Sequence, residues 1–214
     1  MNSAVHALKR LAAILSLAAA ALPAAAEPIV VEVFASQNCT ACPKAHANMA
    51  DLQTTHDDLL ILTWSVDYWD YLGAPDPMAM PEAMERQAAY AEHFGLRGPY
   101  TPQTVYDGVE QCAGNKMRRV RKNLAMREGK TPTLSFTRSP DGAFSLTGEH
   151  ETPVEVSLLH IAELPQSDMV NPVLSVTAYE QDQEIFIPEC QGRCVLIAQN
   201  EGFGEIKAAI WVRD

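Results

Sequence analysis

The sequence is poor in basic residues, with 16 Lys and Arg against 27 Asp and Glu in 214 residues and a formal net charge of −11. Nucleic acids and anionic membrane surfaces are bound by clustered Lys and Arg side chains. One basic cluster is present, "KMRRVRK" at 116–122. It opens a segment with a helical pattern, so we interpret it as a solvated helix face. The composition therefore argues against nucleic acid and anionic membranes as partners.

Long hydrophobic runs are missing beyond the first 26 residues. The run Leu11–Leu22 is too short to span a bilayer, follows Lys9 and Arg10, and precedes small residues around Ala26. This is the pattern of a secretory signal peptide. No Cys stands directly after that point to carry a lipid. We therefore expect residues 1–26 to be cleaved after Ala26, and the mature chain to be periplasmic or secreted without a membrane anchor.

Cysteine is also scarce, and the count of five is odd. In an oxidising compartment an odd count leaves one thiol unpaired or pairs it between molecules. Cys190 and Cys194 enclose the turn-like "QGR", and we predict a local structural disulfide between them. Cys112 is then the odd thiol, unless it pairs with one of these two.

The order of elements predicts an α/β protein with a mixed central sheet flanked by helices. Short strands separated by Pro-Asp-Gly, Asn-Pro and Gly-x-Gly turns then indicate a mostly β portion. We accordingly expect one domain over residues 27–129 and a β-rich C-terminal extension, residues 130–214, packed on it. The predicted elements of the first part are a strand at 28–36, a helix at 39–55, a strand at 58–69, a helix at 81–95, two strands joined by the Asp107–Gly108 turn within 101–114, and a basic helix at 117–129.

The Cys39-x-x-Cys42 motif follows a buried strand directly and opens a helix in "VVEVFASQNCTACPKAHANM". A thiol is a nucleophile only as the thiolate, and the N-terminus of a helix stabilises that anion. With one helical turn between the sulfurs, Cys39 is placed to attack a disulfide and Cys42 to resolve the mixed disulfide. The spacing therefore predicts Cys39 and Cys42 as catalytic residues in thiol–disulfide exchange.

Three blocks of the chain resemble one bacterial family in the same order: "VVEVFASQNCTACP", "VDYWDYLG" and "RQAAYAEHFGLRGPYTPQTVYDG". The family is DUF1223, of secreted thioredoxin-like proteins. The resemblance implies a thioredoxin-like fold, in which a Pro, commonly cis, precedes the third strand and faces the Cys pair. Carried over by motif, this is Thr101–Pro102, with a role in binding substrate. "KTPTLSF" at 130–136 looks locally similar, but the preceding helix and the following Asp-Gly turn favour Pro102.

Residues 67–70 end the second predicted strand, at the sheet edge where sites tend to lie. The resemblance suggests that Asp67 and Trp69 form part of a substrate-binding wall, with a carboxylate accepting a proton from Cys42. The alternative is that Tyr68 and Trp69 belong to the core and that Asp70 caps the loop. On the next helix, Glu82, Glu85 and Arg86 are interpreted as a solvated face.

Three functions follow from the Cys pair. The first is an exported thiol:disulfide oxidoreductase without a resident cofactor, whose partner is a protein or small-molecule thiol or disulfide. The second is a copper or zinc binding or delivery protein, because Cys39, Cys42 and His46 share one helix face and offer soft sulfur and imidazole ligands. For His46, a helix position tuning the thiols is the simpler interpretation. The third is a non-catalytic binding module that keeps Cys39–Cys42 as a permanent disulfide.

Overall fold

The first half of the chain builds a four-stranded mixed sheet in the order β2-β1-β3-β4. Strand β1 pairs parallel with β2 and antiparallel with β3. The structure is a computed structural model that describes residues 27–164, 167–179, 184–187, 190 and 192–212, so the predicted signal peptide lies outside the described residues. The elements of this half are β1 (Ile29–Ala35), α1 (Cys42–Thr55), β2 (Leu59–Ser65), the 3-10 turn η1 (Asp70–Leu72), α2 (Pro81–His93), β3 (Gln103–Tyr106), β4 (Glu110–Ala113) and α3 (Met117–Arg127).

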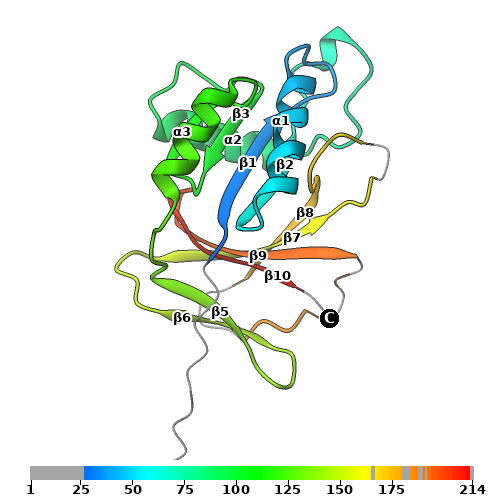
Figure 1. Ribbon diagram of the computed structural model, residues 1–214. Coiled ribbons are helices and arrows are strands. Elements are labelled where there is room, and N and C mark those ends of the chain that lie inside the picture. The colour runs from blue at the N-terminus through cyan, green and yellow to red at the C-terminus, as the bar shows by residue number, and fades with distance from the viewer. Residues whose placement is uncertain (1–26, 165–166, 180–183, 188–189, 191, 213–214) are drawn as a thin grey trace, which may run out of the picture.

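The two faces of this sheet are covered by different elements (Figure 1). On one face, α1 and α3 contribute Met49, Leu52, Val120 and Leu124 to a core with the side chains of β1 and β2. Strands β1 and β2 are buried at all seven positions, as their β-branched and apolar sequences predict. The parallel β1–β2 pair requires a crossover, which α1 supplies.

The second half of the chain is mostly strands, as predicted. A second sheet has the order β10-β9-β7-β8, and β5 and β6 form a separate hairpin. Among the described residues, no helix is long and apolar enough to cross a membrane. The strands are β5 (Leu134–Arg138), β6 (Phe144–Gly148), β7 (Val154–Ile161), β8 (Val173–Tyr179), β9 (Arg193–Asn200) and β10 (Ile206–Val212).

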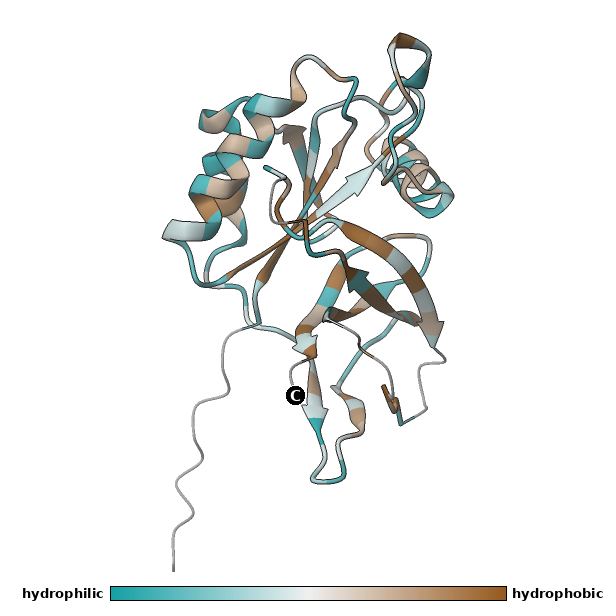
Figure 2. Cartoon of the chain, turned by 90° about the vertical axis from the view of Figure 1, so that its right-hand side faces the viewer, coloured by the Kyte–Doolittle hydropathy of each residue, from teal (hydrophilic) through white to brown (hydrophobic). Residues whose placement is uncertain are grey.

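The second sheet shares a core with the first. Phe34, Trp64 and Tyr90 from the first half lie in one buried cluster with Leu159 and Val195 from β7 and β9. The opposite face of the second sheet packs on the β5–β6 hairpin in a separate cluster. In Figure 2 brown, hydrophobic segments run along the central strands, whereas the helices carry both hydrophobic and hydrophilic colours. The α/β part and the β-rich part are therefore packed against each other through a common apolar core.

Two predicted local features are confirmed. Asp107 and Gly108 both have positive φ, 45° and 73°, in the turn between β3 and β4, as the Asp-Gly sequence predicts. The basic residues Arg118, Arg119, Arg121 and Lys122 on α3 are exposed, as expected for a solvated face. The predicted second strand is shorter than expected, because β2 ends at Ser65 and the chain turns away through residues 66–69.

Candidate active site

The two cysteines of the motif form a disulfide between the end of β1 and the start of α1. The prediction that the helix starts at Cys39 is wrong, since α1 begins at Cys42. Proline explains the difference: a helix from Cys39 would need an N–H at Pro43 to bond the Cys39 carbonyl, and Pro has none. The Cys42 N–H donates to the Cys39 carbonyl instead, at 3.1 Å. Cys39 thus lies in a turn that precedes the helix.

The helix N-terminus favours a thiolate at this position. Residues 42–45 of the first turn are Cys, Pro, Lys and Ala, without a carboxylate. The N-cap residue of α1 is Ala41, and within the described residues no side chain makes a capping hydrogen bond to this end of the helix. The positive end of the helix dipole therefore lies at the pair without a capping oxygen or a first-turn carboxylate to offset it. This field lowers the free energy of an anion there.

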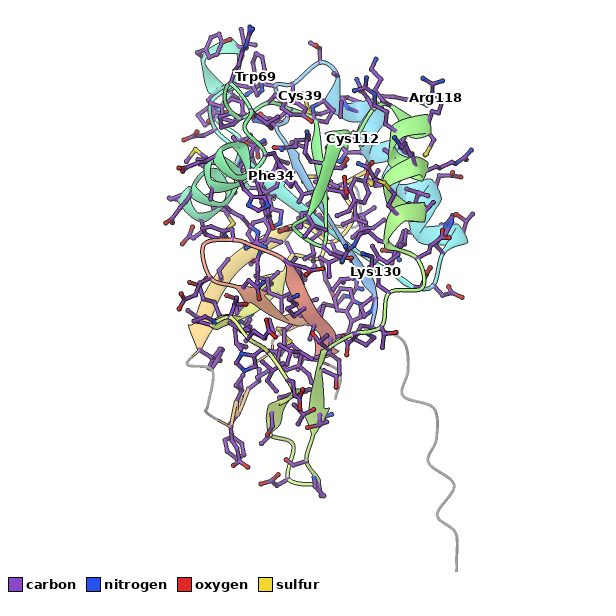
Figure 3. The ribbon with its side chains drawn as sticks, turned by 90° about the vertical axis from the view of Figure 1, so that its left-hand side faces the viewer. Phe34, Cys39, Trp69, Cys112, Arg118 and Lys130 are labelled. Carbon is purple, nitrogen blue, oxygen red and sulfur yellow. A yellow bond between two sulfur atoms is a disulfide. The ribbon has the colours of Figure 1, made fainter. Side chains whose placement is uncertain are left out.

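Trp69 covers the disulfide. Its ring packs on the small cluster of Ala35, Cys39 and Cys42, and its Nε1 donates to Thr101 Oγ1 at 2.7 Å. Cys39 is only 4% exposed and Cys42 1%. Figure 3 shows Trp69 and Cys39 together at the same end of the molecule. The structure therefore brings the predicted residues Cys39, Cys42, Trp69 and Thr101 together.

Pro102 also lies near the first turns of α1. A Cβ added to Gly114 would come within 3.2 Å of Ala45 Cβ and 3.8 Å of Pro102 Cβ, so all three positions are close. The Thr101–Pro102 peptide bond is cis, as the resemblance implied. Gly114 is also hydrogen-bonded to α1, because its carbonyl oxygen accepts a hydrogen bond from Asn48 Nδ2 at 2.9 Å. These contacts hold the chain before β3 against the beginning of α1.

Hydrogen bonds connect a loop after β2 to the turn before Cys39. Asp76 is buried, and its two oxygens accept from the N–H groups of Gln37, at 2.9 Å, and Met78, at 3.0 Å. Asp70 Oδ1 accepts from the Asp76 N–H at 3.1 Å and from Asn38 Nδ2 at 3.3 Å. Asp70 therefore has the loop-capping role that was one of the two interpretations.

The other two residues at the end of β2 lie differently. Asp67 is exposed, and its role in binding substrate stays a prediction. Tyr68 packs on the core, and its hydroxyl donates to Gln87 Oε1 at 3.1 Å. Burial raises the pKa of Tyr68 to about 12, although its bonds with Gln87 and Thr101 act in the opposite direction. Tyr68 is thus a neutral core residue at ordinary pH.

His46 lines a cavity of about 260 Å³ beside the end of β1, together with Asp76, Asp168, Met78 and Met169. Its Nδ1 is buried without a partner among the described residues. Burial lowers the pKa of His46, opposed by the carboxylates of Asp168 and Asp76. In the described part of the chain, no group of three or more His, Cys, Asp or Glu side chains is arranged to hold a metal ion.

The remaining cysteines are separate from this site. Cys190 and Cys194 form the predicted local disulfide. Cys112 is free and buried, with its Sγ 3.5 Å from both Thr104 Oγ1 and the Tyr106 hydroxyl. Burial, and next the neighbouring Cys112, raise the pKa of Tyr106. Cys112 is therefore the odd thiol, enclosed within the first sheet.

The interpretation of Arg86 as part of a solvated face is wrong. Glu82 and Glu85 are exposed, but Arg86 is buried and its Nε lies 2.5 Å from Glu32 Oε1. Burial alone would lower the pKa of Arg86, but Glu32 and Tyr90 raise it above its ordinary value. Glu32 was the available signal, because it is the one charged residue in the buried strand β1, and a buried carboxylate requires a partner.

The comparisons with known proteins place the chain in a family. The model of the family described as "Protein of unknown function (DUF1223)" matches residues 30–184. The chain belongs to the DUF1223 family. The match extends from β1 beyond β8 and thus includes much of the β-rich portion as well as the Cys pair. Among curated proteins, none matches this DUF1223 chain.

Two solved structures resemble this DUF1223 member. The crystal structure of protein AGR_C_4864 from Agrobacterium tumefaciens is 24% identical, with a TM-score of 0.70, and the match covers 88% of this chain and 95% of that one. HBP35 of Porphyromonas gingivalis is 12% identical, with a TM-score of 0.53, and the match covers 87% of this chain and 74% of that one. At these identities the likeness concerns the fold alone.

Proposed function

We propose that this DUF1223 protein is an exported thiol:disulfide oxidoreductase whose first half has a thioredoxin-like fold. The observation that carries the proposal is the Cys39–Cys42 disulfide between β1 and α1, beneath Trp69 and beside Thr101. The sheet order β2-β1-β3-β4, with β3 antiparallel to β1, supports the fold. The signal-peptide pattern of residues 1–26 supports export.

The exchange reaction balances with two cysteines. In the reduced protein, the Cys39 thiolate attacks one sulfur of a substrate disulfide, forms a mixed disulfide and releases the first substrate thiolate. The Cys42 thiolate then attacks Cys39 Sγ, which forms the Cys39–Cys42 disulfide and releases the second substrate thiolate. Two electrons pass from the protein to the substrate. The reverse sequence oxidises a substrate dithiol.

The first test follows exchange with a peptide that contains one disulfide and with the same peptide reduced. The wild-type protein should react with one of them. Cys39→Ser should abolish the reaction, because the nucleophile is lost. Cys42→Ser should accumulate a mixed disulfide through Cys39, detectable as a mass increase equal to the peptide. Cys112→Ser is the matched control and should retain activity, since Cys112 is buried away from the pair.

The low exposure of Cys39 favours one second candidate, a binding module with a permanent disulfide. The same experiment distinguishes the two functions. If neither the disulfide peptide nor the dithiol peptide exchanges with the wild type, and Cys42→Ser traps no mixed disulfide, the oxidoreductase proposal fails. The non-catalytic module then becomes the better account.

A further inference from the structure

Gln87, a polar residue of α2, contacts the segment 100–103 that leads into β3. Its side chain is fully buried. Its Nε2 donates to the Tyr100 carbonyl oxygen at 2.8 Å and to Gln103 Oε1 at 3.0 Å. Because the Tyr100 carbonyl can only accept, the nitrogen of the Gln87 amide must face it, and Oε1 is turned to the other side. One side chain from α2 therefore holds both ends of the segment 100–103.

The Oε1 atom of Gln87 is connected to Trp69 through two hydroxyl groups. It accepts from the Tyr68 hydroxyl at 3.1 Å. The Tyr68 hydroxyl is also hydrogen-bonded to Thr101, whose Oγ1 accepts from Trp69 Nε1 at 2.7 Å. Since Tyr68 gives its only hydroxyl proton to Gln87, the Thr101 hydroxyl must donate to Tyr68. The donors of this chain therefore all point in one direction, from Trp69 towards Gln87.

The chain of hydrogen bonds ends at the disulfide, because Trp69 packs on Cys39 and Cys42. Hydrogen bonds that point in one direction strengthen one another, and a network inside a protein adds little net stability but fixes one geometry of its side chains. We propose that Gln87 is a positioning residue of the disulfide site, which holds Trp69 on the Cys pair through this chain. The effect of Gln87 on exchange rests on the proposed function, whereas its effect on the position of Trp69 does not.

The test follows Trp69 in the mature chain by two readouts that need no exchange substrate. The first is the indole N–H resonance of Trp69, identified by its loss in Trp69→Phe. The second is the rate at which dithiothreitol reduces the Cys39–Cys42 disulfide, followed by alkylation and mass mapping of these two thiols. Gln87→Met keeps the length of the side chain and removes its hydrogen bonds. We expect it to shift the Trp69 resonance and to speed reduction about fivefold, which corresponds to about 1 kcal/mol, the net contribution of one hydrogen bond.

A mutant cycle separates positioning from a general loss of stability. In the Trp69→Ala background, Gln87→Met should no longer speed reduction, because the side chain that it positions is absent. Tyr68→Phe breaks the same chain while keeping its ring, so it should also shift the Trp69 resonance, and it decides the matter if Gln87→Met does not fold. Thr63→Val is the matched control. It removes the hydrogen bond from the buried Thr63 Oγ1 to the Val170 carbonyl, elsewhere on β2, and should change neither readout.

Two results overturn the positioning role of Gln87. One is a Trp69 resonance that is the same in wild type, Gln87→Met and Tyr68→Phe. The other is an equal acceleration of reduction by Gln87→Met with and without Trp69. Neither result affects the Cys39–Cys42 proposal, which peptide exchange by the wild type tests separately. If the wild type exchanges with neither peptide, the oxidoreductase proposal fails, while the resonance and the mutant cycle still decide the role of Gln87.

Discussion

At the scale of single residues, Trp69 is the aromatic side chain that packs on the disulfide. It packs on Cys39 and Cys42 and is anchored by its bond to Thr101 Oγ1. We predict that Trp69→Ala speeds reduction of the disulfide by dithiothreitol several-fold, because the covering ring is removed. Trp69→Phe keeps most of the packing and loses the anchor, so its rate should lie between wild type and Trp69→Ala. Alkylation of freed thiols at timed intervals measures all three. Equal rates would contradict a covering role.

His46 should make stability depend on pH. Burial lowers its folded-state pKa below the ordinary value of 6.5, so the unfolded chain binds the proton more readily. The stabilisation is fully present above that value and is lost as the pH falls through it towards the folded pKa. Denaturant unfolding from neutral to acidic pH should show a smaller loss for His46→Asn than for wild type. His93→Asn, at an exposed position of α2, should retain the full pH dependence. Identical slopes for wild type and His46→Asn would contradict this assignment.

The buried ion pair between Arg86 and Glu32 should contribute to stability. Arg86→Met leaves the Glu32 carboxylate buried without its partner, so we predict a loss of about 3–5 kcal/mol in the free energy of unfolding. Replacing both residues by Met should recover much of that loss, because no uncompensated charge remains. Arg118→Met, on the exposed face of α3, is the control and should change little. Denaturant unfolding measures each variant, and a small effect of Arg86→Met alone would contradict the pairing.

At the scale of elements, Asp76 joins the loop after β2 to the turn before Cys39. Asp76→Ala removes the acceptor of the Gln37 and Met78 N–H groups, and we predict a cost of about 1–3 kcal/mol and faster amide hydrogen exchange at Gln37. Asp67→Ala, in the same segment but exposed, is the control and should leave exchange at Gln37 unchanged. Equal protection of the Gln37 amide in wild type and Asp76→Ala would show that the loop is held by other contacts.

The sequence predicted the elements whose causes are local. The β-branched run gave β1, Pro43 and Pro81 marked the first turns of α1 and α2, and Asp107–Gly108 marked the β3–β4 turn. It could not predict contacts between elements distant in sequence. The sequence around Arg86 is typical of an exposed helix face, and only the fold shows its hydrogen bonds to Glu32 and Gln199. In the same way, only the fold shows that Asp76 accepts a hydrogen bond from the Gln37 N–H. The residues that lie together at the disulfide, Cys39, Cys42, Trp69 and Thr101, were named from the sequence. The hydrogen bonds of Asp70 and Asp76 that hold the neighbouring loop were not.

At the scale of the whole molecule, the two sheets depend on one core. Trp64 and Phe34 pack with Leu159 and Val195, so removal of residues 130–214 would expose this face to water. We predict that residues 27–129 alone unfold without a cooperative transition and bind a hydrophobic dye, whereas residues 27–214 unfold cooperatively. Thermal unfolding followed by circular dichroism compares the two. A cooperative transition of the shorter chain would contradict the shared core.

The central claim is that Cys39 and Cys42 form a reversible redox pair within a stable fold. The most direct measurement is equilibration of the mature chain in a series of thiol–disulfide buffers, with the redox state of the pair read by alkylation and the fold by circular dichroism. We predict one two-electron transition of Cys39–Cys42 while the fold remains intact. A pair that stays oxidised in every buffer until the protein unfolds would contradict the claim.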